Sequence, residues 1–465
     1  MFGVASALAL VASLALFWPG ISLYDTVAQY GQVLSGEYDD WHPPAMAWLW
    51  AALHGIVGGG ATPMLVGQMA SYWLGFGLIA AGLGAIGRRR AGWAVLAIAA
   101  WPPFLGWQAA VLKDAQMTGA MLASVGLVGW WRLRGRRVPA AAWAAVAVLL
   151  CYAVLVRANA VFAVVPLAVM LVPGWKPLAR SGAGLAGIVG VLAVSGPINH
   201  DLLGAQRSGV ERTEAIYDLA GIAVRVPDAP GLPIDRAAIA ALIKRHCVKG
   251  FFWDPLGEPD RCNGVVEPLR HIPPGTLYAT LARMIAAHPL AYAGHRLTHL
   301  NSTDRWMVCA GWSSAAPPMT GQPNDLGLGD PDRAAAGFEQ AAGRLIDVPF
   351  AWPVAWIVVA ATAWVIAVLR PAEPARDLSL ALSTSALAME GSFAVISIAS
   401  DLRYHLWSMI AAALAALLVA DGTGRGERRV LLVGASVLTL VVAAGVMARI
   451  RLPAPPESYI GMLAW

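Results

Sequence analysis

Apolar runs of membrane-spanning length alternate with short polar stretches along most of the chain. A run of about 20 apolar residues matches the thickness of a bilayer core, in which a helix satisfies its own backbone hydrogen bonds. The pattern therefore predicts an all-α polytopic membrane protein with about eleven transmembrane helices. The predicted spans are residues 3–18, 63–86, 92–110, 115–131, 139–156, 160–173, 182–198, 349–369, 378–399, 404–420 and 430–448.

Lys and Arg gather at alternate ends of these runs, which predicts their orientation. Basic residues are enriched in cytoplasmic loops, so the N-terminus is expected inside and the C-terminal tail outside. This topology accounts for the positive charge without a nucleic-acid partner. The basic clusters lie at residues 87–90, 132–137, 176–180, 370–376 and 424–429.

The longest polar stretch, residues 200–347, is predicted to lie outside the membrane as a mixed segment. The first loop, residues 19–62, lies on the same side, and its apolar part, residues 43–57, is too short to span and predicts an interfacial helix. The chain then divides into an N-terminal transmembrane module, the extracytoplasmic segment, C-terminal transmembrane helices and an outer tail, at residues 1–199, 200–347, 348–448 and 449–465.

Composition supports a membrane protein, because 58% of residues are hydrophobic and 13% are charged, whereas soluble domains carry about 25% charged residues. The first apolar run lacks a basic start and a small-residue cleavage site, so we expect a retained anchor. Cys247 and Cys262 lie in the extracytoplasmic segment, where they predict a disulfide, with free buried thiols as the alternative.

Ionisable residues gather where predicted spans meet the outer face, and such residues are costly there unless solvated or paired. We expect one outward cavity lined by acids from the first loop and by cations from other loops. Arg403, Arg157 and Lys113 suit a phosphate, and Asp25 suits proton abstraction. The groups are Asp25, Asp39, Asp40 and His42; Lys113 and Asp114; Arg157 and Asn159; and Asp401, Arg403, Tyr404 and His405.

Structural roles remain open as alternatives for these residues. Glu390 lies mid-span and needs a buried partner or a polar cavity. The alternatives are a helix N-cap for Asp25, a solvated turn for Asp39 and Asp40, a rigid helix start for His42, a local ion pair for Lys113 with Asp114, and headgroup contacts for Arg157.

The order of these motifs resembles the GT-C superfamily of glycosyltransferases, which use polyprenyl-phosphate-linked sugars. Relatives such as the lipid A aminoarabinose transferase and protein O-mannosyltransferases carry an acid early in the first outer loop, followed by a basic-Pro-Pro element. Asp25 and the stretch Asp39-Asp40-Trp41-His42-Pro43-Pro44 are similar, with His42 in place of the usual Lys. Arg403-Tyr404 resembles a late Arg-Tyr pair of the family.

The resemblance implies transfer of a sugar from polyprenyl phosphate to an unknown acceptor, by inverting single displacement, at the outer face of a bacterial inner membrane. Asp25 would be the general base. The donor phosphate would be held by Arg403, Tyr404, Lys113, Arg157 and His42, and Asp39, Asp40 and Trp41 are candidates for binding sugar or acceptor.

No cofactor is required by this scheme. Some relatives bind a divalent cation through paired acids, but Asp39 and Asp40 are adjacent in an extended segment and are expected to point apart, so no metal is favoured. Two rival functions remain: a transporter or lipid-linked-sugar flippase, and a non-enzymatic envelope assembly protein that binds through residues 200–347.

Overall fold

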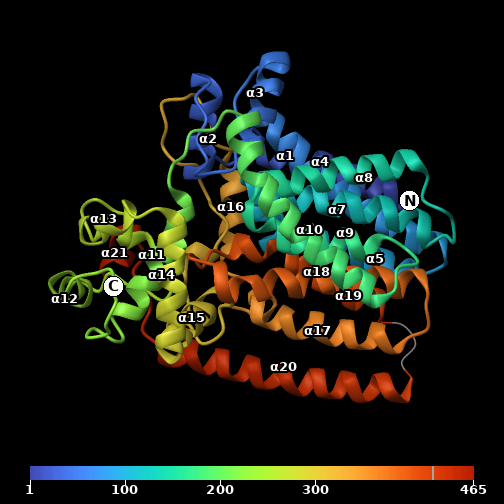
Figure 1. Cartoon of the computed structure of the whole chain (residues 1–465). Helices are drawn as coiled ribbons and strands as arrows, with labels where there is room; N and C mark the ends of the chain where they lie inside the picture. Colours follow the sequence, from blue (N-terminus) through green and yellow to red (C-terminus); the bar gives the residue numbers. More distant parts are fainter. Residues whose placement is uncertain (421–423) are drawn as a thin grey trace.

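The computed structural model describes residues 1–420 and 424–465, and it is built almost entirely of α-helices. Over those two ranges the extended contacts are isolated bridges, and no strand is formed. The all-α class predicted from the apolar pattern is therefore confirmed. Figure 1 shows a bundle of roughly parallel helices, with the N-terminus at its right end and the C-terminus at its left end.

Four helices are long and apolar enough to cross a membrane, as expected of a membrane protein. They are α4 (Thr62–Ala85), α10 (Pro177–Pro197, continued by a π turn to Leu202), α18 (Pro374–Ile396) and α20 (Arg425–Arg451). The other predicted spans fall on shorter helices: α1 (Phe2–Phe17), α5 (Arg89–Ala99), α6 (Pro102–Ala109), α7 (Lys113–Arg132), α8 (Ala140–Val156), α9 (Val161–Leu171), α17 (Pro353–Leu369) and α19 (Leu406–Leu418).

The span predicted over residues 92–110 is not one continuous helix, because the structure divides it into α5 and α6. Pro102 and Pro103 cannot donate backbone hydrogen bonds to the preceding turn, and a proline disfavours the helical conformation in the residue before it. Trp101 accordingly adopts an extended conformation, and α6 begins at Pro102. The short helix expected over residues 43–57 is α3 (Ala45–Val57).

Helices α4 and α7 cross so closely that their glycines touch the opposite backbone. A Cβ added to Gly75 would lie 2.4 Å from the carbonyl carbon of Leu122, and one added to Gly126 would lie 2.7 Å from the Gly75 carbonyl oxygen. Small residues at helix crossings permit this approach, which is common in membrane bundles. The crossing sets the position of the N-terminal end of α7, which carries Lys113 and Asp114.

Residues 200–347, predicted as a mixed extracytoplasmic segment, form helices and loops. Five helices gather at the left end of the bundle, together with α21 (Tyr459–Ala464), whereas α16 (Arg333–Gly343) lies apart from them, beside α1 (Figure 1). A disulfide joins Cys247 and Cys262 within this group. The five helices are α11 (Thr213–Ala223), α12 (Arg236–Lys244), α13 (Asn263–Arg270), α14 (Pro274–Ala287) and α15 (Pro289–Thr303).

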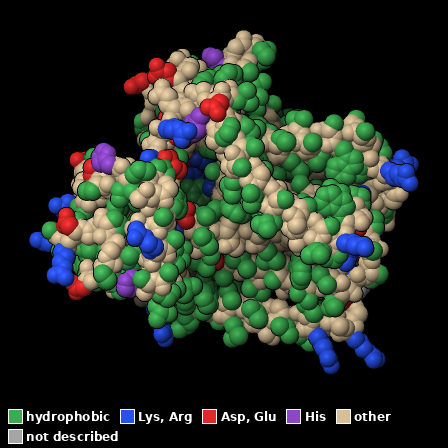
Figure 2. Space-filling view, viewed as in Figure 1, with side chains coloured by type: hydrophobic (Ala, Val, Ile, Leu, Met, Phe, Trp, Pro, Cys, Tyr) green, Lys and Arg blue, Asp and Glu red, His purple; other side chains and the backbone are tan. Residues whose placement is uncertain are grey.

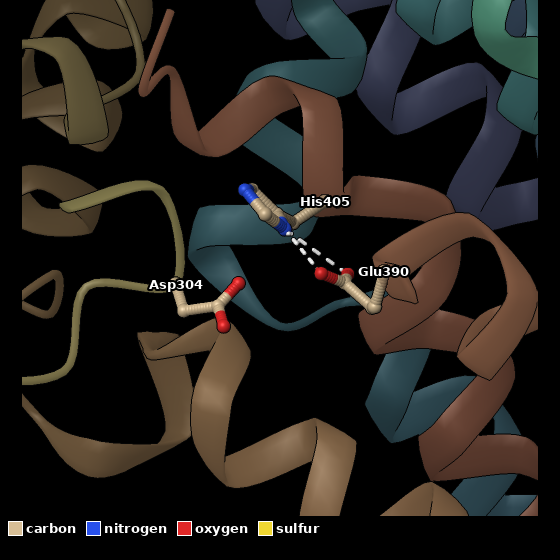
Figure 3. A group of neighbouring side chains, drawn as sticks. All are labelled: Asp304, Glu390 and His405. Carbon is tan, nitrogen blue, oxygen red and sulfur yellow. Dashed lines mark hydrogen bonds and ion pairs between the residues drawn. The ribbon is translucent and has the colours of Figure 1, made fainter. Parts of the chain in front are cut away.

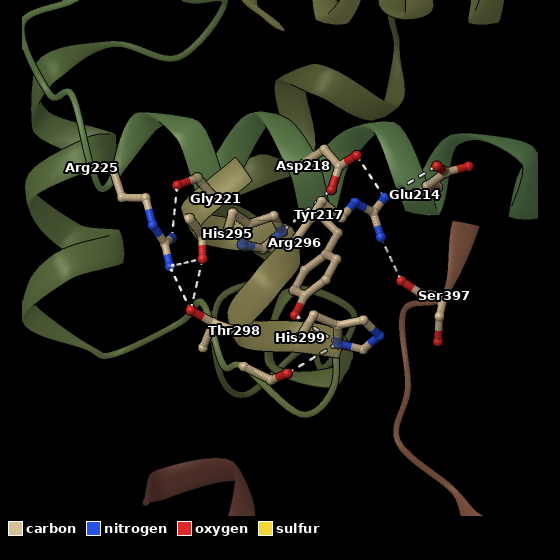
Figure 4. A network of polar contacts seen from close by, with 12 residues as sticks. Glu214, Tyr217, Asp218, Gly221, Arg225, His295, Arg296, Thr298, His299 and Ser397 are labelled. Carbon is tan, nitrogen blue, oxygen red and sulfur yellow. Dashed lines mark hydrogen bonds and ion pairs between the residues drawn. The ribbon is translucent and has the colours of Figure 1, made fainter. Parts of the chain in front are cut away.

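Arg296 of α15 attaches this group of helices to the end of α18. Its guanidinium donates to Asp218 at 2.6 Å and Glu214 at 3.1 Å within the group, and to the carbonyl of Ser397 at 2.6 Å (Figure 4). Trp253 also donates its backbone N–H to Ile398. The segment that leads from α18 to Arg403 is therefore held on one side by the five-helix group.

Figure 2 shows charged side chains concentrated at the two ends of the molecule, with an apolar surface between them. Lys and Arg lie at the right end of the bundle, and side chains of both signs lie at the left end, where the surface is hollowed between the bundle and the five-helix group. This distribution is typical of a protein whose middle faces lipid.

We expect Gly75→Ala to destabilise the protein, because its methyl group overlaps the backbone of α7. Overpacking of this kind costs about 1–3 kcal/mol, which a lower thermal midpoint of the detergent-solubilised protein would report. Gly67→Ala, on the same helix with nothing within 4 Å of its added Cβ, should leave the midpoint unchanged or slightly higher. Equal midpoints for both variants would contradict the close crossing.

Candidate functional site

Asp25 is the second residue of α2 (Tyr24–Ser35), and it is buried. Thr26 fixes this helix start: its hydroxyl accepts the N–H of Leu23 and donates to the carbonyl of Val111. The alternative in which Asp25 caps the helix is therefore wrong, because the N-cap is Leu23 and Thr26 makes the local bond. The contact with Val111 also places Asp25 next to the start of α7.

Three groups from distant parts of the chain surround the Asp25 carboxylate. Arg403 Nη1 lies 3.2 Å from Oδ2, Lys113 Nζ lies 3.5 Å from Oδ2, and His42 Nε2 lies 3.8 Å from Oδ1. Lys113 begins α7, and His42 lies in the loop between α2 and α3. Arg403 lies in η7 (Leu402–His405), a 3-10 turn that leads into α19.

A second set of contacts continues from Arg403. Asp114 pairs with Arg157 and lies 3.9 Å from Arg403 Nε, while Asp401 lies 3.2 Å from Arg403 Nη2. The Arg157 guanidinium also lies over the Tyr404 ring at 4.3 Å. We call this set the charge cluster. Its members are Asp25, His42, Lys113, Asp114, Arg157, Asp401 and Arg403.

These contacts overturn two structural alternatives. Lys113 and Asp114 do not form a local pair: Lys113 turns to Asp25 and His42, and Asp114 turns to Arg157 and Arg403. Arg157 is buried and does not reach toward headgroups. The cluster holds three carboxyl groups and three basic side chains, so its formal charges balance while His42 is neutral.

The electrostatics of the cluster keep Asp25 ionised and His42 neutral. Burial raises the pKa of Asp25, but the charges of Arg403 and Lys113 outweigh burial and hold that pKa well below its usual range. Burial and the Lys113 ammonium lower the pKa of His42 to about 3. Lys113 donates to His42 Nδ1 at 2.5 Å, so the neutral ring carries its proton on Nε2, toward Asp25.

Asp25 and Arg403 line the same cavity, which has a volume of about 820 Å³. Asp401 completes the charged wall, and apolar side chains such as Trp107 and Trp312 form much of the rest. A volume in this range, largely apolar with a few convergent polar groups, is typical of a small-molecule site. His42, Lys113 and Arg157 are not in the lining and support its charged wall from behind.

Two cavity-lining residues, Glu339 and Tyr459, have no signal in the sequence, because each lies in a helix without a recognisable motif. Glu339 of α16 is buried, its carboxylate has no hydrogen-bond partner among the residues described, and burial raises its pKa to about 8. Tyr459 of α21 donates to Glu258 at 2.7 Å and to Asp254 at 3.1 Å. The cavity is therefore bounded by elements from both ends of the chain.

Asp39, Asp40 and Trp41 lie outside this cavity lining. Asp39 accepts the backbone N–H of Trp41, as in a local turn, whereas Asp40 accepts from the backbone and hydroxyl of Ser208, both at 2.6 Å. The two carboxylates point to different partners, as their adjacency predicts. In the structure, Asp40 ties the first loop to the chain that follows α10, and Trp41 packs against Trp253.

Comparison with known proteins does not assign a function to this site. No family model, no curated protein and no solved structure matches the chain. The assignment of function therefore depends on the geometry of the cavity and the charge cluster.

The depressed pKa of His42 predicts how acid affects stability. In the unfolded chain His42 takes up a proton as the pH falls through about 6.5, whereas the folded protein resists protonation down to a pKa of about 3. Between about pH 7.5 and about pH 5, this residue should therefore cost the folded state about 2 kcal/mol. Thermal or denaturant unfolding at several pH values measures the loss.

The matched variant is His42→Asn, which cannot titrate and retains a side-chain acceptor for Lys113. Its free energy of unfolding should fall less than that of the unmodified protein over the same pH range. Parallel curves for the two proteins would show that His42 is protonated as readily in the fold as in the unfolded chain.

Proposed function

We propose that the protein is an integral-membrane glycosyltransferase that moves a sugar from a polyprenyl-phosphate donor to an acceptor at the extracytoplasmic face of a bacterial inner membrane. The observation that carries the proposal is the shared cavity wall of Asp25 and Arg403, with Lys113 3.5 Å from the Asp25 carboxylate. A glycosyl phosphate needs a cationic site for its leaving group and a carboxylate near the attacking nucleophile, and this wall offers both.

In the proposed reaction, Asp25 takes the proton of an acceptor hydroxyl or amine. The acceptor atom attacks the anomeric carbon as the bond from that carbon to the phosphate oxygen breaks, so the configuration inverts. The polyprenyl phosphate departs with the bonding electrons, and Arg403 stabilises its charge. Lys113 and Arg157 stand behind Arg403 and add positive potential, and electrostatic stabilisation of this kind commonly contributes more to catalysis than any other effect.

Donor binding would also activate Asp25. Without donor, Arg403 and Lys113 hold the pKa of Asp25 low, and a carboxylate with so low a pKa is a weak base. A phosphate would share both cations and place its own negative charge beside Asp25. Both effects raise the proton affinity of the carboxylate, so the base becomes effective only when the donor is present.

The proposal includes a GT-C-like arrangement with about eleven spans, the N-terminus inside and the cavity outside. It is supported by the positions of the chain ends, since the N-terminus lies at one end of the bundle and the five-helix group at the other (Figure 1). A transporter or flippase is less well supported, because transporters place their polar site near the membrane midplane on broken helices. Lys113, Arg157 and Arg403 instead lie at helix ends.

The decisive variant is Asp25→Asn, which keeps the size of the side chain and removes the base. With purified protein and a labelled polyprenyl-phosphate sugar, we expect transfer to acceptor, or slow hydrolysis, to fall at least about 100-fold, as for loss of a general base. Asp39→Asn is the matched control, because it lies in the same loop outside the cavity lining, and it should stay within about twofold of the unmodified protein.

Arg403→Gln separates binding from chemistry. Loss of a phosphate contact should weaken donor binding and turnover together, whereas Asp25→Asn should retain donor binding. Unchanged turnover in folded Asp25→Asn protein would overturn the catalytic assignment. Failure of the unmodified protein to cleave any polyprenyl-phosphate sugar, combined with its transport across proteoliposomes, would favour the transporter.

A further inference from the structure

A second polar group includes His405 of the η7 turn, and none of its members lines the cavity. It consists of Asp304 at the C-terminal end of α15, Glu390 of α18 and His405 of η7, and all three side chains are buried. Each offers one ligand atom, and these atoms lie within 4.8 Å of one another. Figure 3 shows the Asp304 carboxylate facing the Glu390 carboxylate, with the His405 ring next to both.

The contacts within this group leave Oδ1 of Asp304 without a partner among the described residues. His405 Nδ1 lies 3.0 and 2.8 Å from the two carboxylate oxygens of Glu390, and Ser408 donates to the same carboxylate. The Asp304 side chain is 8% exposed, and its Oδ1 is buried without a hydrogen-bond partner in the part of the chain that the structure describes. An unpartnered carboxylate aimed at a second carboxylate needs an explanation.

Burial of these carboxylates costs free energy unless a cation or a proton binds between them. Two ionised carboxylates beside a neutral imidazole carry two negative charges, and burial of such charges costs several kcal/mol each without compensation. Within residues 1–420 and 424–465, no Lys or Arg forms an ion pair with Asp304 or Glu390.

We propose that Asp304, Glu390 and His405 bind a divalent transition-metal cation of the Zn²⁺ type. One imidazole nitrogen and two carboxylates are a ligand set that Zn²⁺ accepts, at ligand distances of about 2.0–2.2 Å. The donors would then lie about 3.3 Å apart, and because the ligand atoms now lie within 4.8 Å of one another, the group needs only a modest inward movement. The second oxygen of either carboxylate can complete the coordination, and Ser408 orients Glu390 as an outer partner.

The cation would hold the turn that carries Arg403. His405 is two residues from Arg403 on the same turn, while Asp304 follows the last residue of α15 and Glu390 lies in α18. Binding would fasten α15, α18 and η7 together and so fix where the Arg403 guanidinium meets Asp25. This role is structural, and it does not depend on the proposed sugar transfer.

The test uses the full-length protein, purified in detergent, stripped with a chelator and reloaded with Zn²⁺. Elemental analysis after gel filtration should find about one Zn²⁺ per chain, and Zn²⁺ should raise the thermal midpoint. Asp304→Asn should lower Zn²⁺ affinity at least about tenfold and abolish the thermal shift, although the Asp304 side chain forms no hydrogen bond with the residues that the structure describes. Glu339→Gln changes another buried, unpartnered carboxylate outside the group, and it should bind Zn²⁺ like the unmodified protein.

Two results would overturn the site. One is folded, unmodified protein that retains less than about a tenth of an equivalent of Zn²⁺ after reloading and shows no thermal shift; Asp304 and Glu390 would then share a proton instead. The other is folded Asp304→Asn protein that binds Zn²⁺ as tightly as the unmodified chain. Should Asp304→Asn fail to fold, the Zn²⁺ content and thermal shift of the unmodified protein decide the matter alone.

Discussion

The ion pair between Asp25 and Arg403 is the interaction on which the candidate site depends, because it joins the first loop to the last third of the chain. Its two atoms lie 3.2 Å apart, and both residues line one cavity. Breaking such a buried pair on one side leaves an uncompensated charge, which is strongly destabilising. The remaining members of the charge cluster lower that cost by balancing each carboxylate with a cation, so the cluster is stable only as a set.

The surrounding fold brings the members of this set together from separate directions. Thr26 binds the carbonyl of Val111 and so aligns the start of α2 with the start of α7. Arg296 binds the carbonyl of Ser397 and so connects the five-helix group to the segment before Arg403. A few buried polar contacts therefore align the bundle with the helices outside it. Apolar side chains pack around these contacts.

Much of the charge cluster could be predicted because charges at the ends of apolar spans must pair or be solvated. That constraint applied to Asp25, Lys113, Arg157 and Arg403, and the structure brings all four together. The specific pairings could not be predicted, since sequence neighbours such as Lys113 and Asp114 turn to different partners. The roles assigned to these residues stay proposals.

Other features depend on tertiary contacts that leave no pattern in the sequence. Glu390 was recognisable as a mid-span acid that needs a partner, but Asp304 ends a helix of the 200–347 segment, and nothing marked it as a neighbour of Glu390. The hydrogen bond between Asp40 and the backbone of Ser208 similarly forms only in the folded chain. Pro102 and Pro103 disfavour a continuous helix, but the hydropathy of residues 92–110 is uninterrupted and predicts one span.

The contact between Gly75 and the α7 backbone has a mechanical consequence. Helices that touch backbone to backbone cannot slide past each other without losing the contact, so α4 and α7 behave as one stiff unit that carries Lys113 and Asp114. Arg403, which meets this unit through Asp114, lies on a short 3-10 turn between α18 and α19. We therefore expect any change in cavity width during a reaction cycle to come from the C-terminal elements, with α4 and α7 as the fixed frame.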